Sequence, residues 1–182
     1  MPASFQRCII PLTLGWEALC CGLNPRRHWW DEIDPGVYLG AAPTRTQLVR
    51  LHALGVRGIV NLCLADELPA IDYAGLGLEC LRLPTIDRTP PTSAHLQQAL
   101  DFIARHRAAN DRVYVHCRAG RGRGATIALC WLMQSRGLAP AAAYAELLKQ
   151  RLQIDPALDR REVVTRFWSE TVARNAAPTA RA

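Results

Sequence analysis

Lysine is almost missing from this chain. Lys149 is the single lysine among 22 basic residues, so arginine supplies nearly all of the positive charge. Acidic residues number only 16, and the formal net charge at pH 7 is +6. Because a basic surface attracts anionic groups such as lipid headgroups, we expect an anionic partner. We do not expect a nucleic acid as that partner.

A long apolar run is also missing. No uninterrupted stretch reaches the roughly 18 apolar residues that predict a transmembrane helix. Residues 8–23 are mostly apolar, but Pro11 and Glu17 interrupt them, and arginines and a tryptophan pair follow. Basic residues beside tryptophan suit a membrane interface, so residues 8–30 are a candidate for peripheral membrane contact. The alternatives for the N-terminal segment 1–28 are that it packs on the domain or forms a disordered leader. A cleaved secretory signal is disfavoured, because no cleavage site of small residues follows the apolar run.

The cysteines lack the spacing of a metal site. Cys20 and Cys21 are adjacent rather than separated by two residues, and the other cysteines are scattered. Seven cysteines cannot all pair in disulfides, and an odd count favours a reducing compartment. We therefore expect a cytoplasmic location, with peripheral membrane attachment as a candidate, and a mitochondrial one in a eukaryote. We expect no metal and no organic cofactor.

The chain is rich instead in small and basic residues at 113–126, where it reads Val-Tyr-Val-His-Cys-Arg-Ala-Gly-Arg-Gly-Arg-Gly-Ala-Thr. The pattern predicts a short strand that delivers Cys117 into a loop, followed by a helix. Loop N–H groups and the positive end of the helix dipole would converge on a dianionic phosphate. Arg123 follows Cys117 after five intervening residues. Its planar guanidinium would bind the same phosphate and would favour the thiolate form of Cys117.

This loop predicts a thiolate that attacks phosphate esters. The positions expected to hold the phosphate beside the nucleophile are Arg118, Ala119, Gly120, Arg121, Gly122 and Gly124. One alternative is a buried structural cysteine beside an arginine-rich turn. Another is a rhodanese-type sulfurtransferase, whose loop usually closes one residue sooner.

A phosphocysteine mechanism also needs a proton donor for the leaving oxygen. Asp87 is the first choice, because it lies in a proline-bounded loop between a predicted strand and helix, and could later activate water. A solvated turn or a pair with Arg88 is the competing interpretation. His116 would orient the loop and help to hold the thiolate rather than act as a base, or would simply be a core histidine. The alternative acids, from an earlier loop, are Asp66, Glu67 and Asp72.

Strand and helix patterns alternate along the chain. Strands are predicted at 37–39, 57–63, 78–83 and 113–116, and helices at 45–54, 94–108, 124–136, 140–151 and 157–174. This order predicts an α/β fold with a mainly parallel central sheet of four to five strands flanked by helices. We expect one catalytic domain at 29–174 and a frayed tail at 175–182.

The sequence resembles the dual-specificity branch of the cysteine-dependent protein tyrosine phosphatase superfamily over about three quarters of its length. His116-Cys117 with Arg123 matches the superfamily signature, and Ile33–Gly40 and Gly58–Leu62 resemble that branch's first strand motifs. The resemblance implies a dual-specificity phosphatase fold and cysteine-dependent phosphatase activity.

Three segments are most similar to the mitochondrial-type phosphatidylglycerophosphate phosphatase family: Trp29–Asp34, Leu81–Asp87 and Val113–Arg121. This second resemblance implies a membrane phospholipid substrate and strengthens Asp87 as the general acid. Arg118 and Arg121 also resemble basic loop positions of inositol phospholipid phosphatases, and they favour a substrate with more than one phosphate group.

One residue departs from the superfamily pattern. A serine or threonine usually follows the loop arginine and is thought to ease departure of the sulfur, but here the residue is Gly124. Thr126 is expected to point elsewhere. We therefore expect normal phosphate binding and a slow second chemical step.

Three interpretations follow. The first is a phosphatase for an anionic phospholipid such as phosphatidylglycerophosphate or a phosphoinositide. The second is a dual-specificity protein phosphatase acting on a phosphoprotein. The third, which Gly124 motivates, is a weakly active phosphate-binding module.

Overall fold

The computed structural model describes residues 28–176. The elements in chain order are β1 (Trp30–Asp34), β2 (Val37–Gly40), α2 (Arg45–Ala53), β3 (Val56–Asn61), η1 (Ala74–Leu76), β4 (Glu79–Arg82), α3 (Ser93–Ala108), β5 (Arg112–His116), α4 (Arg123–Arg136), α5 (Pro140–Gln150), η2 (Leu158–Arg160) and α6 (Glu162–Ala176). The predicted interfacial segment lies outside the described residues, apart from its last few positions. So does most of the predicted tail, although α6 continues into its first two residues.

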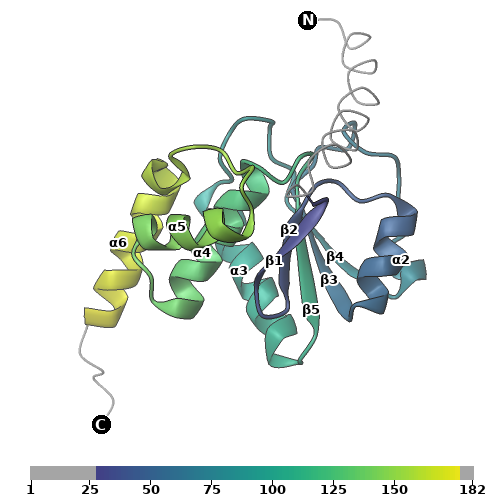
Figure 1. Cartoon of the computed structure of the whole chain (residues 1–182), viewed down its shortest axis with the longest axis horizontal. Coiled ribbons are helices and arrows are strands. Elements are labelled where there is room, and N and C mark those ends of the chain that lie inside the picture. Colours follow the sequence, from purple (N-terminus) through teal and green to yellow (C-terminus); the bar gives the residue numbers. More distant parts are fainter. Residues whose placement is uncertain (1–27, 177–182) are drawn as a thin grey trace, which may run out of the picture.

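A five-stranded sheet in the order β1-β2-β5-β3-β4 forms the centre of the fold (Figure 1). Every neighbouring pair is parallel except β1 and β2, which are antiparallel. The predicted mainly parallel α/β sheet is therefore confirmed. The edge strand β1 was missed, because Trp-Asp-Glu-Ile-Asp is too acidic to resemble a strand, although charged residues are common on exposed sheet edges.

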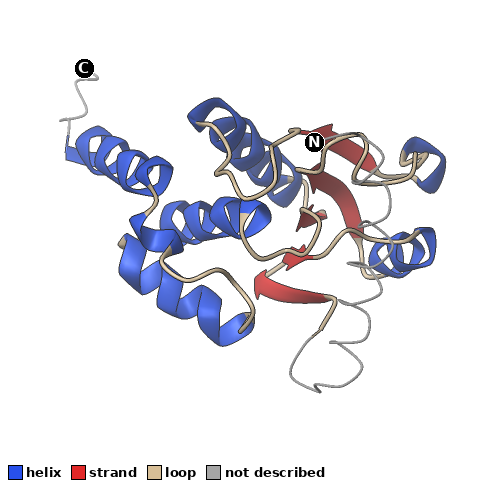
Figure 2. Cartoon of the chain, turned by 90° about the horizontal axis from the view of Figure 1, so that it is seen from above, coloured by secondary structure: helices blue, strands red, loops and turns tan. Residues whose placement is uncertain are grey.

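The sheet separates two hydrophobic layers. Helix α2 covers one face with Leu48 and Leu51, against Tyr38, Ile59 and Tyr114 of the strands. Helices α3 to α6 cover the other face and enclose the larger core (Figures 1 and 2). Helix α4 is buried almost all round, as its composition predicts, and it therefore runs through the centre of this layer.

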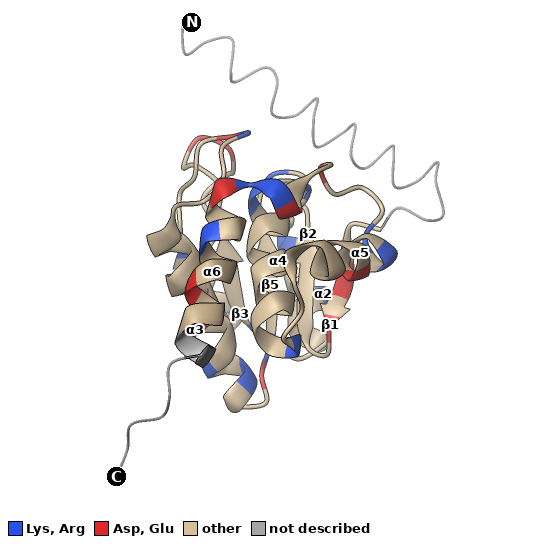
Figure 3. Cartoon of the chain, turned by 90° about the vertical axis from the view of Figure 1, so that its left-hand side faces the viewer, with Lys and Arg blue, Asp and Glu red and all other residues tan. Residues whose placement is uncertain are grey.

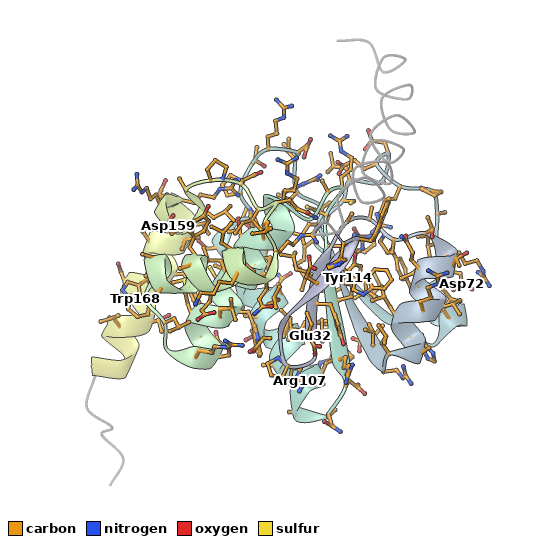
Figure 4. All side chains as sticks on the ribbon, in the orientation of Figure 1. Glu32, Asp72, Arg107, Tyr114, Asp159 and Trp168 are labelled. Carbon is orange, nitrogen blue, oxygen red and sulfur yellow. The ribbon has the colours of Figure 1, made fainter. Side chains whose placement is uncertain are left out.

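The strand ends define two edges of the sheet. In Figure 4, Glu32 and Arg107 lie near the lower edge, where the parallel strands begin, and Tyr114 lies within the sheet. The buried Tyr114 hydroxyl donates a hydrogen bond to the Ala41 carbonyl at the opposite edge, just after β2. The loops that follow β2, β3, β4 and β5 all leave from that upper edge, which is where sites form in parallel sheets.

The last predicted helix, 157–174, begins late. Ala157 has a left-handed backbone (φ 57°), η2 follows, and Arg161 is extended, so α6 starts only at Glu162. Leu158 is buried in the core and fixes this irregular turn. The other predicted elements begin and end within two residues of the observed ones. The late start has a consequence for the site, because it leaves Arg161 free to face the upper edge instead of joining the helix.

Candidate active site

The predicted loop leaves β5 at the upper edge of the sheet and ends at the start of α4. Cys117 is buried at the base of a pocket of about 340 Å³. The predicted site residues that line this pocket are Asp87, Cys117, Arg118, Ala119, Arg121, Gly122 and Arg123. The lining residues that were not predicted are Arg88, Thr89, Asp155 and Arg161. The structure therefore brings together the proposed nucleophile, loop, arginine and acid.

The carbonyl groups of residues 118–122 are all bonded outside the loop. Across a trans peptide the C=O and the next N–H point in opposite directions, so these bonds turn the N–H groups of 119–123 toward the pocket. Such a ring of N–H groups binds anions. The carbonyls accept, in order, from the Ala42 N–H (3.0 Å), the Arg151 guanidinium (3.2 and 2.9 Å), the Asp155 N–H (3.0 Å) and the Thr126 N–H (2.9 Å).

Arg151 orients the loop from behind, and sequence reasoning missed it. Its buried guanidinium also pairs with Asp31 (2.7 Å), whose carboxylate compensates the buried charge. Its partners lie 31 and 120 residues away in the sequence. At the end of a predicted helix such an arginine looks like an ordinary surface residue. Its acidic partner, Asp31, comes from the edge strand β1, which the sequence pattern did not predict.

Arg123 is buried and held in one orientation. Glu67 binds it with two hydrogen bonds (2.7 and 2.8 Å), and the Thr85 carbonyl accepts a third (2.8 Å). Burial alone would lower the pKa of Arg123, but the bonds to Glu67 and the charges of Glu67, Cys117 and Asp87 raise it overall, so the cation persists. Glu67 also accepts from the Leu64 N–H (2.7 Å).

The alternative acids take other positions. Glu67 is buried and its two oxygens are occupied by Arg123 and a backbone N–H, which is the geometry of a positioning residue rather than a proton donor. Asp72 accepts a hydrogen bond from the Gly75 N–H in η1 (2.9 Å). Neither Asp66 nor Asp72 is among the described residues that line the pocket.

Asp87 lies at the pocket mouth and bridges two arginines. Its carboxylate oxygens are 2.6 Å from Arg118 and 3.0 Å from Arg123, whereas the competing interpretation of the sequence left it solvated or paired with Arg88. Arg88 itself has a left-handed backbone (φ 63°), which lets the loop turn sharply after the acid. A phosphate in the pocket would bind the same two guanidinium groups that now hold Asp87.

His116 is fully buried beneath the loop. Burial, helped by the nearby Arg123 charge and opposed by the Cys117 backbone, lowers the pKa of His116 to about 3, so its ring is neutral. The ring stacks on Tyr114 with centroids 5.6 Å apart. Within residues 28–176 neither ring nitrogen has a hydrogen-bond partner. A neutral ring can shape the loop, but it contributes no positive charge to the thiolate.

Two glycines of the loop have different constraints. Gly120 has a left-handed backbone (φ 64°), and a Cβ there would meet the backbone of Gly40, so only glycine fits. A Cβ on Gly124 would lie 3.2 Å from Leu39 Cδ1 and 3.5 Å from the Cys117 nitrogen, so a small side chain fits beside the nucleophile once the end of the Leu39 side chain shifts by a few tenths of an ångström. Thr126 points elsewhere, as expected: its hydroxyl donates to the Gly122 carbonyl (2.9 Å).

Comparison with known proteins agrees with this geometry. Residues 37–165 match the family described as dual specificity phosphatase, catalytic domain. Phosphatidylglycerophosphate phosphatase PTPMT2 of Arabidopsis thaliana is 34% identical over 160 residues, which cover 85% of this chain and 69% of that protein. Human phosphatidylglycerophosphatase and protein-tyrosine phosphatase 1 is also 34% identical, over 81% of this chain and 77% of that protein.

Solved structures show the same fold. The crystal structure of PTPMT1 in complex with PI(5)P superimposes with a TM-score of 0.75 at 33% identity, covering 82% of this chain and all (100%) of that one. The active form of Tk-PTP gives a TM-score of 0.72 at 28% identity, covering 78% of this chain and 97% of that one.

Proposed function

Because this chain belongs to the dual specificity phosphatase family, we propose that it removes the phosphomonoester of an anionic phospholipid through a phosphocysteine on Cys117. The observation that carries the proposal is the pocket, in which five arginines and two aspartates surround a buried cysteine. The relatives named as phosphatidylglycerophosphate phosphatases, and the PTPMT1 complex with PI(5)P, support a phospholipid substrate.

The first step transfers the phosphoryl group to sulfur. The substrate phosphate displaces Asp87 from Arg118 and Arg123 and lies against the loop N–H groups. The Cys117 thiolate then attacks phosphorus, so that an S–P bond forms as the P–O bond to the lipid headgroup breaks. Asp87, released from its ion pairs and protonated, gives its proton to the leaving alkoxide.

The second step hydrolyses the phosphocysteine and regenerates the Cys117 thiolate. Asp87, now a carboxylate, takes a proton from a water molecule that attacks phosphorus, and the S–P bond breaks to give inorganic phosphate and the Cys117 thiolate. The departing sulfur gains negative charge at this stage. Gly124 has no hydroxyl to donate a hydrogen bond to it, and the hydroxyl of Thr126, two residues further on, is bonded to the Gly122 carbonyl.

Gly124→Ser is expected to raise steady-state turnover. In the unmodified enzyme we expect a burst of alcohol product equal to the enzyme concentration, followed by slow release of phosphate. One hydrogen bond to a charged group contributes about 1.5–3 kcal/mol, so the serine should increase kcat by roughly tenfold or more. Stopped-flow assays with p-nitrophenyl phosphate would measure both phases. Unchanged turnover in Gly124→Ser would contradict this account of the second step.

Two exposed apolar side chains, each close in sequence to residues that line the pocket, suggest how the enzyme meets a lipid surface. Ile86, beside the proposed acid, and Leu152, in the α5–η2 connection, are 66% and 56% exposed. Figure 3 shows basic and acidic segments gathered along the same upper edge, above α4 and α6. No helix between residues 28 and 176 is long and apolar enough to cross a bilayer. We propose that this edge rests on the membrane, with residues 8–30 as a further candidate contact.

Serine at Ile86 and Leu152 together is expected to weaken binding to anionic vesicles by roughly tenfold or more, since two large apolar side chains contribute about 1.5–3 kcal/mol each when buried. Vesicle sedimentation with phosphatidylglycerol would measure it. The control is Val49→Ser, because Val49 is 52% exposed but lies on α2, on the other side of the sheet. Equal losses in both variants would contradict a specific membrane-facing edge.

A protein substrate is the competing function. Among the described residues none of the side chains lining the pocket is aromatic, so a phosphotyrosine ring would lack the wall it stacks on. Parallel phosphate-release assays on phosphatidylglycerophosphate, a phosphoinositide and a phosphotyrosine peptide test the choice. We expect a clear preference for a lipid. Equal rates on all three would contradict the lipid proposal.

A further inference from the structure

Two clusters of the same composition line the pocket. In the first cluster, Arg118 and Arg123 share the Asp87 carboxylate, at 2.6 and 3.0 Å. In the second cluster, Arg121 and Arg161 share the Asp155 carboxylate, at 4.0 and 3.3 Å. The first cluster surrounds the place of the scissile phosphate. The second cluster lines the same pocket and has no part in the chemistry described above.

The second cluster is built into the scaffold of the loop. Arg161 donates to the Gly122 carbonyl (3.3 Å) and the Thr126 hydroxyl (2.8 Å), and Arg121 donates to the Gln153 carbonyl (3.0 Å). These bonds fix the two guanidinium groups at the rim. Each guanidinium has five N–H donors, so both keep donors for a ligand. Their side chains stay 45% and 22% exposed, for Arg121 and Arg161, so a ligand can reach them.

The charges of the second cluster match a second anion. Two guanidinium groups and one carboxylate leave one positive charge in excess. The ion pairs to Asp155 are longer than those to Asp87, and Asp155 is itself 37% exposed, so solvent screens its hold on the arginines. A singly charged group that offers two oxygens, such as a phosphodiester, can bind both guanidiniums beside Asp155.

We propose that the second cluster binds the phosphodiester of the substrate while the first cluster and Cys117 hold its phosphomonoester. The inference rests on the proposed phosphatase function and names the substrate class more closely: two phosphate groups joined by a short polyol. The sequence pattern placed Arg118 and Arg121 together, but in the structure they belong to different clusters. Arg118 belongs with the reacting phosphate, whereas Arg121 and the unpredicted Arg161 select the second one.

A pair of soluble substrates tests the proposal. Deacylated phosphatidylglycerophosphate carries a phosphomonoester and a phosphodiester, and glycerol 3-phosphate carries the phosphomonoester alone. The readout is the ratio of kcat/KM for these two compounds. We expect a ratio of at least about tenfold, the size of one charge-assisted hydrogen bond. A ratio is used because general damage to the loop lowers both rates together and leaves it unchanged.

Arg161→Gln and Arg121→Gln should each bring the ratio down toward one, mainly through KM for the diester compound. Asp155→Asn keeps both arginines and removes the competing carboxylate, so the ratio should rise severalfold, which a purely structural role would not produce. The matched control is Arg166→Gln, on the exposed side of α6, where Arg166 pairs only with Glu162 among the described residues. Its ratio should equal that of the unmodified enzyme.

A ratio near one in the unmodified enzyme, or a ratio that Arg161→Gln and Asp155→Asn leave unchanged, would overturn the second-phosphate site. Release from both compounds that depends on Cys117 would then still support the phosphatase function. Failure to release phosphate from any compound would instead contradict the proposed function itself.

Discussion

Cys117→Ser is expected to lower phosphate release from every substrate by about 10⁴-fold or more, the scale of losing a covalent nucleophile. A serine hydroxyl is not ionised near neutral pH, so no anionic nucleophile would remain at the base of the pocket. The loop N–H groups and Arg123 stay in place, and substrate binding should persist. Phosphate-release assays with the lipid and with p-nitrophenyl phosphate would measure the loss, and circular dichroism would check the fold.

The control for that variant is Cys80→Ser. Burial raises the pKa of the Cys80 thiol to about 11, in β4 and outside the pocket, so it stays protonated and should be dispensable. Release that survives Cys117→Ser would overturn the mechanism. If the unmodified enzyme turns over measurably and Cys117→Ser abolishes that turnover, the alternative of a weakly active phosphate-binding module is contradicted.

Asp87→Asn is expected to lower kcat by about 10²–10⁴-fold on an alkyl phosphate such as the lipid, the usual contribution of a general acid. An alkoxide leaves poorly without a proton. The loss on p-nitrophenyl phosphate should be much smaller, because nitrophenolate departs as a stable anion. The amide keeps the size of the carboxylate and retains one oxygen to accept from Arg118 or Arg123. Initial rates on the two substrates would show the difference.

Glu67→Gln is the matched comparison for that difference. Glu67 binds Arg123 with both oxygens and does not line the pocket among the described residues, so its loss should disturb phosphate binding and lower both rates alike. Equal losses on the two substrates in Asp87→Asn would mean that Asp87 positions arginines and donates no proton. If Glu67→Gln instead lowered the rate on the alkyl phosphate much more than on p-nitrophenyl phosphate, Glu67 would be the proton donor.

The loop could be predicted because its residues are neighbours in the sequence. Cys117, Arg123 and the glycines between them lie on one continuous segment, and strand and helix patterns place that segment at a strand end. The position of Asp87 at the pocket could be predicted for a similar reason, since Asp87 follows another strand that ends at the same edge; its role as the acid stays a prediction.

The residues that hold the loop could not be predicted in this way. Glu67 and Arg123 are 56 residues apart, Arg151 and Asp31 are 120 apart, and Arg161 reaches back 39 residues to Gly122. Each is a charged residue that looks solvated until folding brings its partner. The continuous helix predicted at 157–174 also concealed Arg161, because a left-handed Ala157 and a buried Leu158 interrupt it.

The most direct measurement is the mass of the Cys117 peptide after the enzyme is mixed with excess substrate and quenched in acid within the first turnover. Slow hydrolysis beside Gly124 should leave a phosphoryl group on Cys117 in close to one copy per enzyme, and Gly124→Ser should lower that fraction. Steady phosphate release with no phosphoryl group on Cys117, at any quench time and in either protein, would contradict a reaction that passes through this cysteine.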